Sequence, residues 1–251
     1  MQFPVELAWG PLHLPVHLLC ETLAYTLGYR LYAHLRARAA DRIDDTGRQW
    51  ILVGAAAGAL LGSRLLGLLE HPALLLHPPG GWLYYATNRT IVGGFLGGLV
   101  GVELTKKRRG ITASSGDLMV FPLLLGLGIG RVGCFLSGLE DGTYGTATAL
   151  PWGIDFGDGI ARHPTNLYEI LGLLLLGAGL WLSEQRKPLP DGWRFRWLMV
   201  GYLVFRLLVE YIKPTLAPAG WGLTAIQWAC VVGLGYYAWL WGQRSTRTPS
   251  G

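Results

Sequence analysis

Long apolar segments alternate with short polar segments along the whole chain. A helix needs about 20 mainly apolar residues to cross a bilayer, and seven segments approach this length. They lie near 14–33, 50–69, 91–105, 116–138, 165–183, 195–212 and 223–242. This pattern predicts an all-α, polytopic integral membrane protein with about seven transmembrane helices, formed by a single transmembrane domain over residues 1–251.

Lysine and arginine are concentrated in alternate connections between these segments. The basic connections hold Arg36, Arg38, Arg42 and Arg48, then Lys106, Lys107, Arg108 and Arg109, then Arg186, Lys187 and Arg194, and finally Arg244 and Arg247 in the tail. The intervening connections hold only Arg89, Arg162 and Lys213. Basic loops favour the cytoplasmic side. We therefore expect the N-terminus outside, the C-terminus in the cytoplasm, and two long outward loops at 70–90 and 139–163.

Composition narrows the class of protein further. Only 15% of the residues are charged and 51% are apolar, whereas soluble domains carry about 25% charged residues. The net charge of +5 is spread over short loops, so membrane orientation explains it better than nucleic-acid binding. Cys20, Cys134 and Cys230 lie singly in apolar segments, without metal or disulfide spacing. We expect no metal, no cofactor, no nucleic-acid partner and no cleavable signal peptide.

Ionisable residues inside the apolar segments are candidates for function, because a charge at the bilayer centre costs at least ~2.5–3.5 kcal/mol. Those near segment ends, Arg30, Arg64 and Glu103, can extend to the interface. Arg206 and Glu210 are one helical turn apart and can neutralise each other. Arg131 has no charged residue within a turn. Its partner is therefore Glu169 or Glu210 from another helix, or an anionic ligand.

Glycines surround Arg131 at positions 126, 128, 130 and 133. They either allow close helix packing or leave the guanidinium open. An open guanidinium in a membrane protein suits a phosphate, which arginine binds with two parallel hydrogen bonds. The phosphodiester available in this environment is a phospholipid headgroup.

Four motifs, in this order, give the chain a family resemblance. They are "GRVGCFLSG" at 130–138, "PWGIDF" at 151–156, "RHPTNLYE" at 162–169 and "FRLLVE" at 205–210, with weaker support from "LGSR" at 61–64 and "GGFLGG" at 93–98. The sequence resembles the prolipoprotein diacylglyceryl transferases of bacterial membranes over most of its length.

The resemblance implies a transferase of the bacterial cytoplasmic (inner) membrane. Such enzymes move the diacylglyceryl group of phosphatidylglycerol to the thiol of a lipobox cysteine in a preprolipoprotein. A thioether forms and glycerol phosphate leaves. The implied partners are therefore phosphatidylglycerol, the lipobox peptide and the bilayer.

The resemblance also implies roles for individual residues. The catalytic set is Arg131, Arg206, Tyr202 and His163. The substrate-binding set is Arg131, Arg206, Glu210, Arg64, Arg162, Tyr168, Glu169, Gly142 and Glu21. In this assignment the two arginines stabilise the negative charge that grows on the leaving phosphate. His163 either takes the thiol proton or only caps a helix and bonds to backbone.

The chain departs from the family pattern at several positions. Val92 stands where many members have histidine, Cys134 where they have asparagine, and Glu21 near a family tyrosine. Glu21 is either a replacement base or an ion-pair partner of an arginine. Cys134 is either a nucleophile or a small buried apolar residue. These departures keep alternatives open: a different acceptor, or a non-catalytic protein that binds or moves phospholipid.

Overall fold

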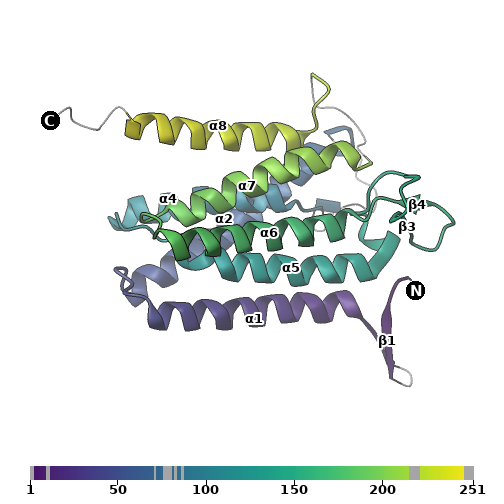
Figure 1. Ribbon diagram of the computed structural model, residues 1–251, viewed down its shortest axis with the longest axis horizontal. Helices are drawn as coiled ribbons and strands as arrows, with labels where there is room; N and C mark the ends of the chain where they lie inside the picture. The colour runs from purple at the N-terminus through teal and green to yellow at the C-terminus, as the bar shows by residue number, and fades with distance from the viewer. Residues whose placement is uncertain are drawn as a thin grey trace. The chain divides into compact units, whose positions relative to one another are not determined.

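The computed structural model describes residues 3–9, 12–70, 72–75, 81, 84–85, 88–214 and 221–245. Within them the chain forms seven α-helices (Figure 1). The helices are α1 (Val16–Arg38), α2 (Asp45–Glu70), α4 (Ile91–Arg109), α5 (Val120–Ser137), α6 (Thr165–Arg186), α7 (Trp193–Val209) and α8 (Ala225–Ser245). Each overlaps one apolar segment of the sequence, so the prediction of a helical chain is confirmed.

Short strands and 3-10 turns complete the described elements. Strand β1 (Glu6–Trp9) pairs antiparallel with β2 (Leu12–Pro15), and β3 (Ile154–Asp155) pairs antiparallel with β4 (Ala161–Arg162). The 3-10 turns are η1 (Pro72–Leu75), η2 (Asp117–Met119), η3 (Gly138–Asp141) and η4 (Glu210–Ile212).

Three of the described helical segments are long and apolar enough to cross a membrane. They are Asp45–Glu70, Asp117–Asp141 and Thr165–Arg186. The membrane character of the chain is thus supported by its helices, whereas the count of seven spans and their orientation stay predictions. Part of the expected outward loop at 70–90 (residues 71, 76–80, 82–83 and 86–87), and Arg247 in the tail, lie outside the described residues.

The chain divides into two compact units. Unit 1 comprises residues 1–40, 116–198 and 211–214, and unit 2 comprises residues 41–115, 199–210 and 215–251. Helix α7 contributes its first residues to unit 1 and the rest to unit 2. The expectation of a single transmembrane domain stays a prediction.

In unit 1, α5 packs against both α1 and α6 (Figure 1). Helices α1 and α5 run antiparallel, since Gly126 faces the Ala24 carbonyl and Gly133 faces Cys20. A Cβ atom at position 133 would lie only 2.8 Å from Cys20 Cβ, so close packing at this end of α5 requires glycine.

In unit 2, α2 and α4 pack through a ladder of glycines. We call Gly54, Gly58, Gly62, Gly93, Gly97 and Gly101 the glycine ladder. A Cβ atom at Gly97 would lie 2.3 Å from the Gly58 carbonyl oxygen, and a Cβ atom at Gly58 would lie 2.2 Å from the Gly97 carbonyl oxygen. Because lipid supplies no hydrophobic driving force between helices, such close backbone contact is a main source of their association.

The basic run at 106–109 occupies the last turn of α4, where the sequence predicts a loop. Positive side chains near a helix C-terminus interact favourably with the helix dipole, which explains why the helix continues through the run. It ends at Gly110, which has the left-handed φ of 67° that favours glycine. At the other end of α4, the Thr90 side chain accepts a hydrogen bond from the Gly93 amide.

Candidate functional site

Arg131 forms a buried ion pair with the following helix. Its Nε atom on α5 lies 2.8 Å from Glu169 Oε2 on α6, and the two side chains are 7% and 1% exposed. Of the partners that the sequence allows for Arg131, the structure selects Glu169. The pair joins the motif at 130–138 to the motif at 162–169, although the two residues are 38 positions apart (169 − 131).

The glycines around Arg131 are expected either to allow close helix packing or to leave its guanidinium open. The whole residue is 6% exposed. Gly126 and Gly133 face α1, whereas a Cβ atom at Gly128 or Gly130 would meet nothing within 4 Å. Two of the four glycines therefore serve helix packing, and the carboxylate of Glu169 contributes to covering the cation.

Cys134 lies one turn beyond Arg131 on α5 and contacts the same guanidinium. The Arg131 Nη1 atom donates toward Cys134 Sγ at 3.6 Å. The Cys134 side chain is half-buried. All three cysteines, which lie among the described residues, are free thiols.

The motif at 162–169 connects the loop to the first turn of α6. The Thr165 hydroxyl donates to the Thr143 carbonyl at 2.6 Å, and the Thr143 hydroxyl lies 2.8 Å from the Asn166 amide oxygen. Thr165 and Asn166 are both buried. Gly142, just before this contact, has a φ of 66° and ends η3. Glycine is favoured there because the left-handed conformation is strained for other residues.

His163 and Tyr168 lie together at the N-terminal end of α6. His163 Nδ1 lies 3.2 Å from the Tyr168 hydroxyl, which also accepts a hydrogen bond of 2.8 Å from Trp152 Nε1. The backbone amide of His163 donates to the Thr146 carbonyl. The ring of His163 thus contacts a side chain, whereas its backbone fixes the loop.

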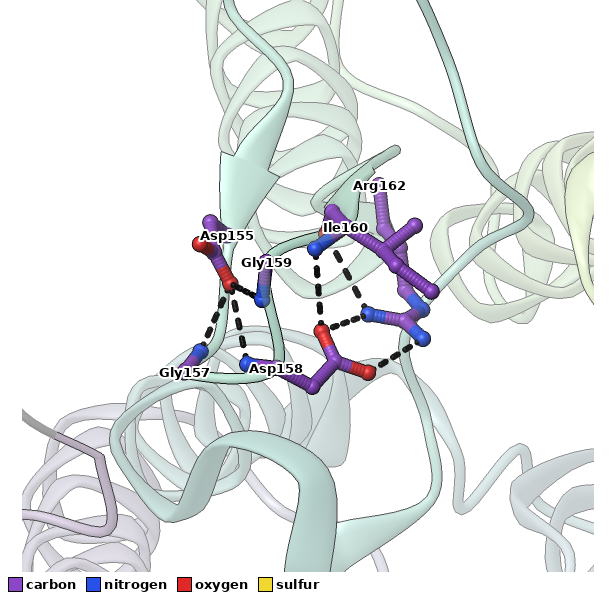
Figure 2. A network of polar contacts seen from close by, with 6 residues as sticks. All are labelled: Asp155, Gly157, Asp158, Gly159, Ile160 and Arg162. Carbon is purple, nitrogen blue, oxygen red and sulfur yellow. Dashed lines mark hydrogen bonds and ion pairs between the residues drawn. The ribbon is translucent and has the colours of Figure 1, made fainter.

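Two carboxylates organise the turn between β3 and β4 (Figure 2). Asp155 Oδ1 accepts hydrogen bonds from the backbone amides of Gly157, Asp158 and Gly159 at 2.8, 3.1 and 3.0 Å. Asp158 accepts two hydrogen bonds of 2.6 Å from the guanidinium of Arg162 (Figure 2). The hydrogen bonds from Arg162 hold the pKa of Asp158 below its ordinary value, and those to Asp158 raise the pKa of Arg162.

This ion pair predicts a pH-dependent loop. A lowered carboxyl pKa stabilises the folded turn above the ordinary aspartate pKa of about 3.9, and this stabilisation is lost as pH falls through the lowered value. At neutral pH we expect slower amide hydrogen exchange over residues 154–162 in the wild type than in Asp158→Asn, with the difference vanishing in acid. Glu140→Gln removes an exposed carboxylate that lies before residues 154–162. This change is expected to leave the difference in hydrogen exchange that Asp158→Asn causes intact. A difference that persists unchanged in acid would contradict the prediction.

Unit 2 holds the second buried arginine of the sequence motifs. Arg206 Nη1 lies 2.8 Å from Glu210 Oε2, as the one-turn spacing predicts. Glu210 Oε1 accepts a hydrogen bond of 3.4 Å from the Thr224 hydroxyl. Thr224 also caps α8, since its hydroxyl accepts from the Gln227 amide and its own amide donates to Gln227 Oε1.

The other residues predicted for the site are divided between the two units. Tyr202 on α7 is 1% exposed and packs against Phe95, with ring centroids 4.9 Å apart, in unit 2. Arg64 is half-buried on α2 and Val92 is completely buried in the first turn of α4, also in unit 2. Glu21 is half-buried on α1 in unit 1.

Comparison with known proteins assigns the chain to a family. The family model for prolipoprotein diacylglyceryl transferase matches residues 4–242. The chain belongs to this family. It is therefore a membrane transferase of lipoprotein biosynthesis, and the resemblance read from its motifs is confirmed.

Individual proteins that carry the name of this family are also similar to the chain. A protein of Methylobacillus flagellatus named phosphatidylglycerol–prolipoprotein diacylglyceryl transferase is 38% identical over 183 residues, covering 69% of this chain and 68% of its own length. Proteins of the same name from Polynucleobacter asymbioticus and Polaromonas naphthalenivorans are each 34% identical. They cover 72% and 79% of this chain, and 71% and 76% of their own lengths.

Two residues near Arg131 in the transferase are not predicted as site residues from the sequence. His17 at the start of α1 and Asp141 at the end of η3 both lie close to Cys134. No spacing rule connects positions 17, 134 and 141, so only the packing of α1 on α5 brings them together. The acidic pair in "LEDG" directly after the fourth apolar segment is the one signal that points to this place.

Proposed function

We propose that this transferase moves the diacylglyceryl group of phosphatidylglycerol to the thiol of a lipobox cysteine in a preprolipoprotein. The observation that carries the proposal is the buried pair of Arg131 and Glu169, which connects two of the family motifs. A guanidinium held by a carboxylate is already desolvated and oriented before substrate binds, which is the condition for strong electrostatic stabilisation.

The reaction is a displacement at the glyceryl carbon that carries the phosphate. The acceptor sulfur forms a bond to this carbon, and the bond between the carbon and the ester oxygen of the phosphate breaks. Glycerol phosphate then leaves with an additional negative charge. Arg131 and Arg206 are each assigned a role in phosphate binding, because arginine offers paired donors and keeps its charge at any working pH. Each cation stabilises the charge that appears on the leaving oxygen.

Other residues position these groups and the substrates. Glu169 and Glu210 orient the two arginines, in keeping with distances of 2.8 Å to each. Tyr202 lies one helical turn before Arg206 and supports the same region of α7. Individual roles in binding the lipid or the peptide are assigned to Arg162, Tyr168, Gly142 and Glu21 in unit 1 and to Arg64 in unit 2.

His163 accepts the proton of the acceptor thiol in this proposal. The contact of its ring with the Tyr168 hydroxyl at 3.2 Å supports a role beyond backbone capping. In the tautomer that this role requires, Nδ1 carries the hydrogen and donates it to the Tyr168 hydroxyl, which orients the imidazole. Nε2 is then the nitrogen that receives the proton.

The proposed setting is the bacterial cytoplasmic membrane, crossed seven times with the N-terminus outside. The loop at 139–163 then faces outward, on the side where lipobox cysteines of secreted preproteins arrive. The alternation of basic connections supports this orientation.

The test is a transfer assay with the purified full-length protein. The protein is incubated with phosphatidylglycerol labelled in its diacylglyceryl group and with a lipobox peptide. We expect a labelled thioether on the peptide cysteine and stoichiometric release of glycerol phosphate, both measured by mass spectrometry. A peptide with serine in place of the lipobox cysteine is the matched control and is expected to acquire no label.

A transferase with a different acceptor is the second candidate. It is favoured by Cys134, Val92 and Glu21, three positions at which the chain departs from the family pattern. Release of glycerol phosphate without labelling of the lipobox peptide would support this candidate. Tight binding of phosphatidylglycerol without any release would instead indicate a protein that only binds or moves the lipid.

A further inference from the structure

Three side chains with the chemistry of metal ligands converge in unit 1. His17 comes from the first turn of α1, Cys134 from α5 and Asp141 from η3. One ligand atom of each lies within 4.8 Å of the corresponding atoms of the other two. An imidazole nitrogen, a thiolate and a carboxylate oxygen are the donors that zinc prefers in proteins.

The fold brings the three residues together through the packing of α1 on α5. A Cβ atom at Gly133 would lie 3.4 Å from His17 Cα, so glycine at this position lets the start of α1 approach the residue before Cys134. Helix α5 then ends, and η3 brings Asp141 within 4.0 Å of His17 Nδ1. The cluster is thus held by two packed helices and a turn.

The His17 ring has a nitrogen without a hydrogen-bond partner among the described residues. Its Nδ1 atom is buried, and it lies 4.0 Å from Asp141 Oδ1, beyond hydrogen-bond distance. In a tetrahedral zinc site, with bonds of about 2.0–2.2 Å, such a nitrogen and oxygen lie about 3.3–3.5 Å apart. Binding of an ion therefore requires the donor atoms to move together by roughly half an ångström to one ångström.

The second oxygen of Asp141 is held from the opposite side. The Thr143 hydroxyl donates to Asp141 Oδ2 and also lies 2.8 Å from the Asn166 amide oxygen. Hydrogen bonds of this kind orient metal-binding carboxylates and are a regular part of metal sites. Asp141 is therefore fixed with its other oxygen toward His17.

The charges around the cluster also balance for a divalent ion. A neutral histidine, a thiolate and a carboxylate together carry two negative charges, which a divalent ion cancels. The adjacent Arg131 is neutralised by Glu169 at 2.8 Å, so it does not oppose the ion with a net positive charge. An overall neutral site is the one that a low-dielectric environment tolerates best.

We propose that His17, Cys134 and Asp141 bind a zinc-like divalent transition-metal ion whose fourth position takes the sulfur of the acceptor cysteine. This rests on the proposed function and departs from the absence of a metal site expected from the sequence. Three protein ligands with one open position are the arrangement of catalytic zinc sites.

The ion supplies the thiolate that the displacement requires. A thiol that coordinates such an ion is deprotonated, and its proton passes to His163. The bound sulfur then forms its bond to the glyceryl carbon, while the carbon–oxygen bond breaks and glycerol phosphate leaves. The thioether product carries no charge and is a weaker ligand, so it leaves the ion.

Cobalt titration of the purified, chelator-treated full-length protein tests the site without relying on activity. We expect a near-ultraviolet thiolate-to-cobalt charge-transfer band that saturates at one cobalt per chain. Cys134→Ser is expected to abolish the band, and the matched variant Cys20→Ala is expected to retain it. His17→Ala and Asp141→Asn are expected to weaken cobalt binding by more than the ~10–100-fold that loss of an outer hydrogen-bond partner costs.

The outcomes separate the metal site from the proposed function. Absence of the band in the wild type, or an equal band in Cys134→Ser, would overturn the metal site. If the site binds cobalt and chelation stops thioether formation until zinc is restored, both proposals stand. If thioether forms equally fast in chelated and zinc-loaded protein, transfer stands and activation of the thiol by the ion is refuted. Metal binding without thioether under any condition would refute the proposed function and retain the metal site.

Discussion

Replacement of Arg131 by lysine is expected to slow thioether formation by about 10²–10³-fold, the usual cost of removing one preorganised donor to a developing anion. Lysine keeps a positive charge near Glu169 but loses the planar array of donors that binds two phosphate oxygens at once. The measurement is the rate of peptide labelling from phosphatidylglycerol at saturating lipid.

The matched control is Arg194→Lys. Arg194 also lies in unit 1 and forms an ion pair, with its Nε atom 2.6 Å from Glu184 Oε1, but it is outside the proposed phosphate site. This variant is expected to retain the wild-type rate. Arg131→Ala is less informative, because removing the cation from a buried carboxylate costs about 3–5 kcal/mol of stability. Equal rates for wild type and Arg131→Lys would contradict the role assigned to Arg131.

Gly97→Ala is expected to destabilise the protein by about 1–3 kcal/mol or more, because it overpacks the glycine ladder. Its methyl group would lie 2.3 Å from the Gly58 carbonyl oxygen and 2.8 Å from Gly62 Cα, both backbone atoms that side-chain rotation cannot relieve. Thermal unfolding in detergent, followed by loss of helical circular dichroism, measures the effect.

The adjacent glycine on α4 provides the control. A methyl group at Gly98 would lie 3.5 Å from the Ala55 carbonyl oxygen and 3.6 Å from Ala59 Cβ, which are ordinary contacts. Gly98→Ala is therefore expected to unfold at or above the wild-type temperature, since alanine also favours the helix. If the two variants unfolded at the same temperature, the ladder would not be the contact that holds α2 against α4.

Hydrophobic segments predict the helices well, because the position of each helix depends only on the residues of its own segment. The seven helices of the described residues all overlap their predicted ranges. The boundaries shift where charges enter, as at the basic run that extends α4 to Arg109. The i, i+4 pair of Arg206 and Glu210 is likewise visible in the sequence, since one helical turn sets its distance.

Contacts between helices are harder to predict because hydropathy does not specify which faces meet. The sequence allows three partners for Arg131, and only the packing of α6 on α5 selects Glu169. The spacing of four residues in the glycine ladder is visible in the sequence, yet it does not tell which glycine opposes which. The cluster of His17, Cys134 and Asp141 has no spacing signal, and only the acidic pair in "LEDG" points to its place.

The ion pair of Arg131 and Glu169 also has a consequence for how the protein enters the membrane during synthesis. Helix α5 alone would carry an unneutralised cation into the bilayer, and α6 alone an anion, each at a cost of at least ~2.5–3.5 kcal/mol. Inserted together as a hairpin, the two helices carry no net charge at this position. The chain between Ser137 and Thr165 must therefore be made before α5 can leave the insertion machinery at low cost. A substitution of Glu169 is therefore expected to impair membrane insertion, before any effect on substrate binding.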